Sequence, residues 1–338
     1  MKNRKIIALG LSAALTLSLA ACGGGNTAES EAPSESAAVE SAESGKTYTV
    51  GICQLVQHEA LDAATQGFKD ALTEELGDSV KFDEQNASGD APTCATIVNG
   101  FVSDGVDLIL ANATAPLQAA ASATDSIPVL GTSVTDYATA LEISDWTGTV
   151  GGNVSGTSDL APLDQQAAMI QEMFPDAKNI GMLYCSGEPN SIYQVDTITK
   201  YLTDMGYTCS NFAFTDSNDV ASVAQAACDA SDVIYIPTDN TAASNTEAIA
   251  NVVIPAKVPV MAGEEGICKG CGVVTLSISY YDLGVTSGKM AAKILTGEAD
   301  ISSMPVEYAP TVTKKYNAAN CEALGITAPE GYEAIAAD

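Results

Sequence analysis

The sequence predicts an α/β protein with two lobes, each built on a parallel β-sheet that carries helices on both faces. Three observations lead to this fold class. The length of 338 residues favours two domains over one. From residue 47 onward, short β-rich runs alternate with amphipathic stretches, as in parallel sheets. After a loop expected near GGNVSGTSD the alternation restarts, which indicates a second sheet.

The elements of the first lobe follow one another as strand, helix and strand. The strands are expected in TYTVGICQ, SVKFDEQ, VDLILAN and IPVLGTS, and the helices in ALDAATQGFKDALTEEL, TCATIVNGFVSD and the stretch between the last two strands. The second lobe repeats the order, with strands in KNIGMLY, YTCSNFAF, DVIYIPT and VPVMAG. Its helices are expected in APLDQQAAMIQEMF, SIYQVDTITKYLTDMG, DVASVAQAACDA and TEAIANVVIPA. The final part, with GVVTLSISYYDLGVTSGKMAAKILTGE and MPVEYAPTVTKK, is expected to cross between the lobes and form a hinge of several segments.

The N-terminal residues have the pattern of a secretory signal peptide, which we place at residues 1–21. Basic residues precede the apolar run 6–21, which is shorter than the roughly 20 residues of a membrane-spanning helix. The run ends in LAAC, which resembles a bacterial lipobox, and we therefore expect Cys22 to become the lipid-bearing N-terminus. Residues 22–46 are rich in Ser, Glu and Ala without apolar periodicity, and are expected to form a disordered acidic tether.

The charge balance restricts the partners. A net charge of −29 argues against binding to nucleic acid or to an anionic membrane surface. Cleavage of the signal peptide removes Arg4, the only arginine, so no guanidinium remains to hold a phosphate or carboxylate through two hydrogen bonds.

The residues that enzymes and metal sites use are scarce. His58 is the only histidine, no second base accompanies Cys53, and no glycine-rich phosphate loop opens a helix. Cys268 and Cys271 have an informative spacing, but a zinc site would need a second pair of ligands. These two cysteines form either a local disulfide or two free thiols. We expect no catalysis, no metal and no cofactor.

Ligands of open parallel sheets bind beyond the carboxyl ends of the strands, so the polar residues that follow each strand are the candidate ligand-binding residues. In the first lobe we expect hydroxyls and helix N-termini to hold a carboxylate, with Thr114 and Ser133 as first choices. In the second lobe an acid is expected to pair with an amine, with Asp239 as first choice and Glu264 as second. Asp239 has an alternative role as a helix N-cap. The full set of candidate ligand-binding residues is Gln54, His58, Asn112, Thr114, Thr132, Ser133, Glu188, Asn190, Ser191, Asp239, Asn240, Glu264 and Tyr280.

Several motifs together resemble one protein family. They are LAAC, QLVQHEALDAATQGF, QNASGD, GNVSGTSD, GEPNS, PTDNT and YYDLGVTSGKMAAKIL. They are similar to the extracellular substrate-binding proteins of ABC importers, in the subfamily with tryptophan- and tyrosine-binding lipoproteins. The chain departs from the family at Glu59, where proline is common, and in the loop from Cys268 to Cys271.

The resemblance implies a type I periplasmic-binding fold, in which two Rossmann-like lobes are joined by a three-segment hinge. On this basis we expect residues 47–158 and 276–304 in the N-terminal lobe, and residues 159–275 and 305–338 in the C-terminal lobe. It implies a receptor on the outer face of the bacterial cytoplasmic membrane that binds Trp, Tyr or Phe and delivers it to an ABC permease with its ATPase. Alternatives are a receptor for a branched-chain amino acid or a nucleoside, and a ligand-sensing module for a membrane signalling partner.

Overall fold

The computed structural model describes residues 46–327 and 329–336. The predicted signal peptide, Cys22 and all but the last residue of the predicted tether lie outside the described residues. None of the helices in the described part of the chain has the length and apolar character needed to cross a membrane.

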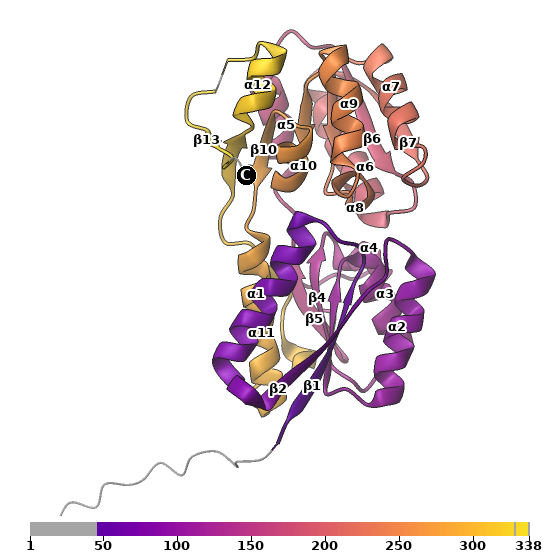
Figure 1. Cartoon of the computed structure of the whole chain (residues 1–338), viewed down its shortest axis with the longest axis vertical. Coiled ribbons are helices and arrows are strands. Elements are labelled where there is room, and N and C mark those ends of the chain that lie inside the picture. The colour runs from indigo at the N-terminus through magenta and orange to yellow at the C-terminus, as the bar shows by residue number, and fades with distance from the viewer. Residues whose placement is uncertain (1–45, 328, 337–338) are drawn as a thin grey trace, which may run out of the picture. The chain divides into compact units, whose positions relative to one another are not determined.

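Two parallel sheets organise the described residues, as the alternating pattern predicts (Figure 1). The first sheet has the strand order β11-β5-β4-β3-β1-β2. Its strands are β1 (Tyr48–Gln54), β2 (Val80–Asn86), β3 (Leu108–Asn112), β4 (Val129–Val134), β5 (Val154–Ser158) and β11 (Glu307–Tyr308). The helices of this half are α1 (Glu59–Leu76), α2 (Ala91–Asp104), α3 (Thr114–Ala123), α4 (Tyr137–Ala140) and α11 (Tyr280–Thr296), with the 3-10 turns η1 (Gly77–Ser79) and η2 (Ile301–Ser303).

The second sheet has the order β13-β12-β10-β9-β8-β6-β7, and only the β10–β12 pair is antiparallel within it. Its strands are β6 (Asn179–Cys185), β7 (Thr208–Phe214), β8 (Val233–Ile236), β9 (Val260–Ala262), β10 (Val274–Ser277), β12 (Thr313–Tyr316) and β13 (Glu333–Ala334). The helices of this half are α5 (Leu163–Met173), α6 (Pro189–Asp204), α7 (Val220–Ala230), α8 (Asn240–Ala243), α9 (Thr246–Ala256), α10 (Glu265–Gly270) and α12 (Ala318–Leu324).

Burial along the strands matches their place in the sheets. All five residues of the central strand β3 are buried, whereas the edge strands β2 and β7 are largely exposed or half-buried. In β1, Val50 and Ile52 pack toward α1 and α11, while Cys53 packs with the α2 side of the sheet. Because successive side chains point to opposite faces, one apolar strand contributes to two cores.

The chain passes between the two sheets three times, after β5, after β10 and after β11. The expected lobe boundaries differ from these positions at two places. Strand β10 extends to Ser277 in the second sheet, so the boundary at 276 falls inside a strand. The boundary at 305 falls before β11, and β11 pairs with Thr157 and Ser158 of β5 in the first sheet. The third passage therefore lies after Tyr308.

Candidate functional site

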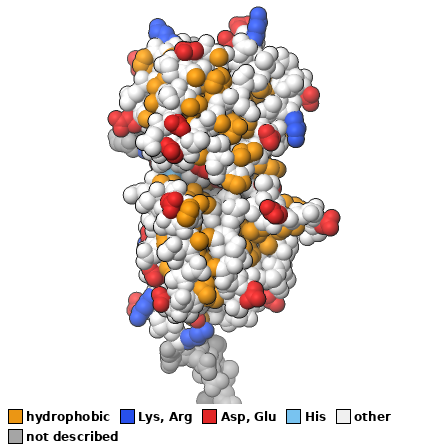
Figure 2. Space-filling model, turned by 90° about the vertical axis from the view of Figure 1, so that its right-hand side faces the viewer, with side chains coloured by type: hydrophobic (Ala, Val, Ile, Leu, Met, Phe, Trp, Pro, Cys, Tyr) orange, Lys and Arg blue, Asp and Glu red, His pale blue; other side chains and the backbone are white. Residues whose placement is uncertain are grey.

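A small cavity lies between the loops of the two sheets, with a volume of about 10 Å³, which is about the space of one water molecule. This is far below the range of about 300–1,000 Å³ that is typical of small-molecule sites, so the lining side chains nearly fill the space between the two halves. Polar side chains dominate its lining, which consists of His58, Leu61, Ser133, Thr135, Asp159, Asn190, Thr238, Asp239, Asn240, Ala243, Glu264 and Tyr280. On one face of the molecule, a groove runs between the two halves (Figure 2).

Seven of the thirteen candidate ligand-binding residues line this cavity: His58, Ser133, Asn190, Asp239, Asn240, Glu264 and Tyr280. They come from both halves of the chain and meet at the carboxyl ends of strands, as parallel topology requires. The other six lie outside the lining, namely Gln54, Asn112, Thr114, Thr132, Glu188 and Ser191.

Most of these six have contacts that position neighbouring elements. Gln54 accepts a hydrogen bond from Thr65 at 2.7 Å and donates to Asp62 at 2.7 Å, which ties β1 to α1. Asn112 donates to the carbonyl of Leu61 at 2.8 Å. The hydroxyl of Thr132 lies 3.0 Å from that of Thr157 in the neighbouring strand, and Ser191 donates to Asp239 at 2.7 Å. Thr114 is buried as the first residue of α3.

The three acids of the second lobe among the candidates, Glu188, Asp239 and Glu264, all accept hydrogen bonds from the protein. Asp239 is the N-cap of α8 and accepts from the amide of Ala242 at 2.8 Å and from the amide of Cys185 at 2.6 Å. The structure therefore shows Asp239 in its alternative role, as the N-cap of α8. Glu188 accepts from the amides of Asn240 and Thr241, both at 2.9 Å.

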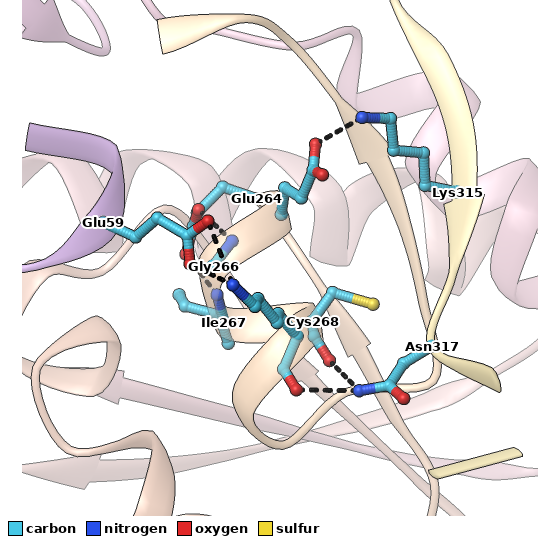
Figure 3. Close-up of polar contacts among 9 residues, drawn as sticks. Glu59, Glu264, Gly266, Ile267, Cys268, Lys315 and Asn317 are labelled. Carbon is cyan, nitrogen blue, oxygen red and sulfur yellow. Dashed lines mark hydrogen bonds and ion pairs between the residues drawn. The ribbon is translucent and has the colours of Figure 1, made fainter. Parts of the chain in front are cut away.

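Glu264 is the N-cap of α10 and accepts from the amides of Gly266 and Ile267 (Figure 3). Because helix N-termini leave several amides without partners, acids after β6, β8 and β9 are used as caps. The positions of these acids in the sequence predict that they lie near the cavity. They do not predict that backbone amides donate hydrogen bonds to the carboxylate oxygens.

His58 connects the two halves of the site. Its Nε2 lies 3.2 Å from Oδ1 of Asn240, whose Nδ2 donates to Glu188 at 2.8 Å. Since Asn240 therefore presents its oxygen to the ring, Nε2 carries the proton. Burial lowers the pKa of His58, although the hydrogen bond to Asn240 opposes this effect. His58 is thus a neutral donor at the wall of the cavity.

Other contacts also join the halves around the cavity. The hydroxyls of Thr135 and Thr238 lie 3.3 Å apart, and Gln194 donates to Thr238 at 2.7 Å. At the outer edge, Lys269 of α10 pairs with Glu59 of α1 at 3.3 Å. These contacts describe an arrangement in which the two halves meet around an enclosed space.

Three polar residues of the lining are absent from the sequence prediction: Thr135, Thr238 and Asp159. Thr135 and Thr238 stand in polar segments that follow β4 and β8, so the same topological argument would have found them. Asp159 ends the motif GNVSGTSD and directly follows β5, a strand whose hydroxyl side chains are all buried. The signal available in the sequence was an acid that directly follows a hydroxyl-rich run, Ser155, Thr157 and Ser158.

The described cysteines are all free thiols, Cys268 and Cys271 included. Both lie in a buried apolar cluster beside β9, and burial raises the pKa of each thiol. A raised pKa disfavours the reactive thiolate. Across residues 46–327 and 329–336, no group of His, Cys, Asp or Glu is arranged to hold a metal ion.

The buried carboxyl group of Glu264 should make the stability of the protein depend on pH. Burial raises its pKa to about 7, although two amide hydrogen bonds favour the ionised form. Above the unfolded value of 4.5, the native state therefore holds a proton that the unfolded state has lost. The resulting stabilisation is complete at pH below that value and is lost as pH rises through 7.

We expect the free energy of unfolding to fall between pH 5 and pH 8, with Glu264 contributing up to about 3 kcal/mol. Urea unfolding at several pH values measures this slope, and Glu264→Gln should flatten it. The same substitution at the exposed Glu322 controls for the loss of one negative charge. Equal slopes for wild type and Glu264→Gln would contradict the assignment.

Comparisons with known proteins agree with the geometry. A family model described as "ABC transporter substrate binding protein" matches residues 49–338. A tyrosine-binding protein of Clostridioides difficile is 35% identical over 310 residues, which cover 90% of this chain and 88% of that protein.

Two solved structures are similar to this chain and have nearly equal sequence identity to it. The first is an ABC domain from Streptococcus pneumoniae in complex with L-Trp, 34% identical, with a TM-score of 0.81 over 86% of this chain and 100% of that one. The second is the ligand-free, open structure of a substrate-binding protein with adhesive properties from Clostridium difficile, 36% identical, with a TM-score of 0.65 over 86% and 99%. The two sheets thus form the predicted type I periplasmic-binding fold, and the resemblance of the sequence motifs to the family is confirmed: the chain belongs to the ABC transporter substrate-binding protein family.

Proposed function

We propose that this protein is the lipid-anchored receptor of an ABC importer, and that it binds Trp, Tyr or Phe in the cavity between its two lobes. The observation that carries the proposal is the convergence of polar side chains from both halves of the chain around one small cavity. A relative that is 34% identical is in complex with L-Trp, and another that is 35% identical is a tyrosine-binding protein.

The arrangement of the halves supports binding by closure. The structure is more similar to the complex with L-Trp than to the ligand-free, open structure, with TM-scores of 0.81 and 0.65 at 34% and 36% identity. Contacts such as His58 with Asn240 and Thr135 with Thr238 join the halves around the cavity. A ligand that touches both halves stabilises the closed form by its differential affinity for that form. Closure is then the signal that the permease recognises.

The predicted signal peptide and the lipobox cysteine Cys22 support attachment to the outer face of the cytoplasmic membrane. The acidic residues up to position 46 would act as a tether between the lipid and the folded lobes. In this function the protein binds and releases its ligand without chemical change.

A thermal-shift screen of the purified protein against the twenty amino acids and the common nucleosides tests the proposal. A ligand present at 100 times its dissociation constant stabilises the native state by about 2.7 kcal/mol. We therefore expect Trp, Tyr or Phe to raise the melting temperature by several degrees, since a chain of this size shifts by roughly 1.5–2 °C per kcal/mol. A response to branched-chain amino acids or nucleosides alone would contradict the aromatic ligand and favour one of the alternatives.

A further inference from the structure

Asp159 differs from every other acid at the cavity. It follows β5 at the first passage between the sheets, it is 4% exposed, and it lines the enclosed space. Its Oδ2 accepts a hydrogen bond from the hydroxyl of Tyr280 at 2.8 Å. Its Oδ1 is buried and has no hydrogen-bond partner among the described residues. A buried carboxylate oxygen without a donor is costly, and a native structure that keeps one has a reason for it.

Among the described residues, none of the other buried acids near the cavity has a carboxylate oxygen that lacks a hydrogen bond, as Oδ1 of Asp159 does. The carboxylates of Glu188, Asp239 and Glu264 each accept hydrogen bonds from backbone amides at both oxygens. Their geometry caps helices and ties loops together. A cationic group that enters the cavity therefore finds its free acceptor at Asp159.

The cavity supplies no cation of its own for Asp159. No lysine is among its lining residues in the described part of the chain. His58 lies in the lining, but burial lowers its pKa and the ring is neutral. A buried carboxylate is stable in its ionised form only when a cation pairs with it. Burial raises the pKa of Asp159, with the hydroxyls of Tyr280 and Thr135 opposing the rise, and a cationic group of a ligand would favour its ionised form.

Ser133 provides a second polar atom without a partner in the same cavity. Its Oγ is buried and makes no hydrogen bond among the described residues. The backbone of Ser133 has φ of +54°, in the left-handed region, at an irregularity in the pairing of β4 with β5. Such strain in a residue other than glycine is concentrated at functional sites. The hydroxyl can donate to a carboxylate oxygen.

We propose that Asp159 binds the ammonium group of an α-amino acid, while Ser133 donates a hydrogen bond to the carboxylate of the same ligand. This inference rests on the proposed function and names the atoms that recognise the amino-acid backbone. Tyr280, which fixes Oδ2, is a positioning residue. The amine is thus held by residues at the passages between the lobes, since Asp159 follows β5 and Tyr280 begins α11. The acids of the second lobe have the separate role of shaping its loops.

Isothermal titration calorimetry tests this assignment with two pairs of probes. Each pair joins an amino acid to the same molecule without its ammonium group: L-tyrosine with 3-(4-hydroxyphenyl)propionate, and L-tryptophan with indole-3-propionate. Of the two amino acids, the one that binds the wild-type protein more tightly is expected to bind about 10- to 100-fold more tightly than the same molecule without its ammonium group. In Asp159→Asn, which preserves shape and can still accept from Tyr280, that ratio should fall to within about threefold of unity.

Asp136→Asn is the matched control. Asp136 lies in the same half but outside the cavity lining, and it caps α4 by accepting from the amide of Thr139 at 2.7 Å. Asparagine caps as well as aspartate does, so the ratio should stay at the wild-type value.

Each outcome decides the assignment. An unchanged ratio in Asp159→Asn, with wild-type binding intact, overturns the inference alone. If Asp159→Asn does not fold, the wild-type protein alone still tests the inference. A probe without the ammonium group that binds wild type within about threefold of its amino acid overturns it. Failure of the wild-type protein to bind any of L-tyrosine, L-tryptophan and L-phenylalanine overturns the proposed function, and this inference with it.

Discussion

Gly284→Ala is expected to lower the free energy of unfolding by about 3 kcal/mol or more. Helices α1 and α11 pack so closely that a Cβ at Gly284 would lie 2.0 Å from the carbonyl oxygen of Ala64 and 2.9 Å from the amide nitrogen of Phe68. Both contacts are with backbone atoms, which cannot rotate away. The two helices would have to separate, which would open the buried cluster that contains Phe68.

The same separation should weaken ligand binding. Helix α1 begins directly after His58, and α11 begins at Tyr280, so the spacing of the two helices sets the positions of two cavity residues. Equilibrium urea unfolding measures the stability, and calorimetry with L-tryptophan or L-tyrosine measures the binding.

Gly100→Ala is the matched control for this prediction. Gly100 lies inside α2, it is exposed, and an added Cβ would meet no atom within 4 Å. Because alanine is the better helix former, we expect this variant to keep or gain up to about 1 kcal/mol of stability. If Gly284→Ala unfolds at the same urea concentration as Gly100→Ala, the close packing of α1 on α11 is incorrect.

Asp239→Ala is expected to lower the free energy of unfolding by about 2–4 kcal/mol. The substitution removes the cap of α8 and leaves the amide of Cys185 and the hydroxyl of Ser191 without their buried acceptor. Burial, followed by the nearby charge of Glu188, raises the pKa of Asp239, so part of this loss is offset by removal of a costly buried acid.

Asp239→Asn separates the cap from the remaining contacts. Asparagine can still accept from the amide of Ala242, so this variant should lose only about 1 kcal/mol, the typical contribution of one hydrogen bond. Urea unfolding of both variants measures the difference. A stable Asp239→Ala protein that has lost its ligand affinity would instead make Asp239 a ligand-binding residue, as its position in the sequence suggests.

The two carboxylates Asp239 and Asp159 therefore have opposite expected phenotypes. Loss of Asp239 should appear mainly in stability, because protein donors occupy its oxygens. Loss of Asp159 should appear mainly in the recognition of the ammonium group, because one of its oxygens is unoccupied. Measuring stability and affinity on both variants distinguishes loop shaping from ligand recognition.

The sequence alone determined the fold class and the region of the site. The alternation of β-rich and amphipathic runs is a local property, so it predicted two parallel sheets and most of their strands. It missed β5, whose residues were expected in a loop, and β13. Topology then placed the polar segments after β1, β4, β8 and β9 at one site, and His58, Ser133, Asp239 and Glu264 do meet there. The motifs also identified the family.

Only the tertiary structure decided which polar atoms remain available to a ligand. Whether Asp239 or Asp159 can accept from an ammonium group depends on hydrogen bonds between residues more than fifty positions apart, such as Asp239 with Cys185 and Asp159 with Tyr280. The same holds for β11, whose two residues join the first sheet through pairing with the distant strand β5. Sequence patterns report periodicity and residue type. They do not report which donors the folded chain brings to each acceptor, and that allocation separates a capping acid from a binding one.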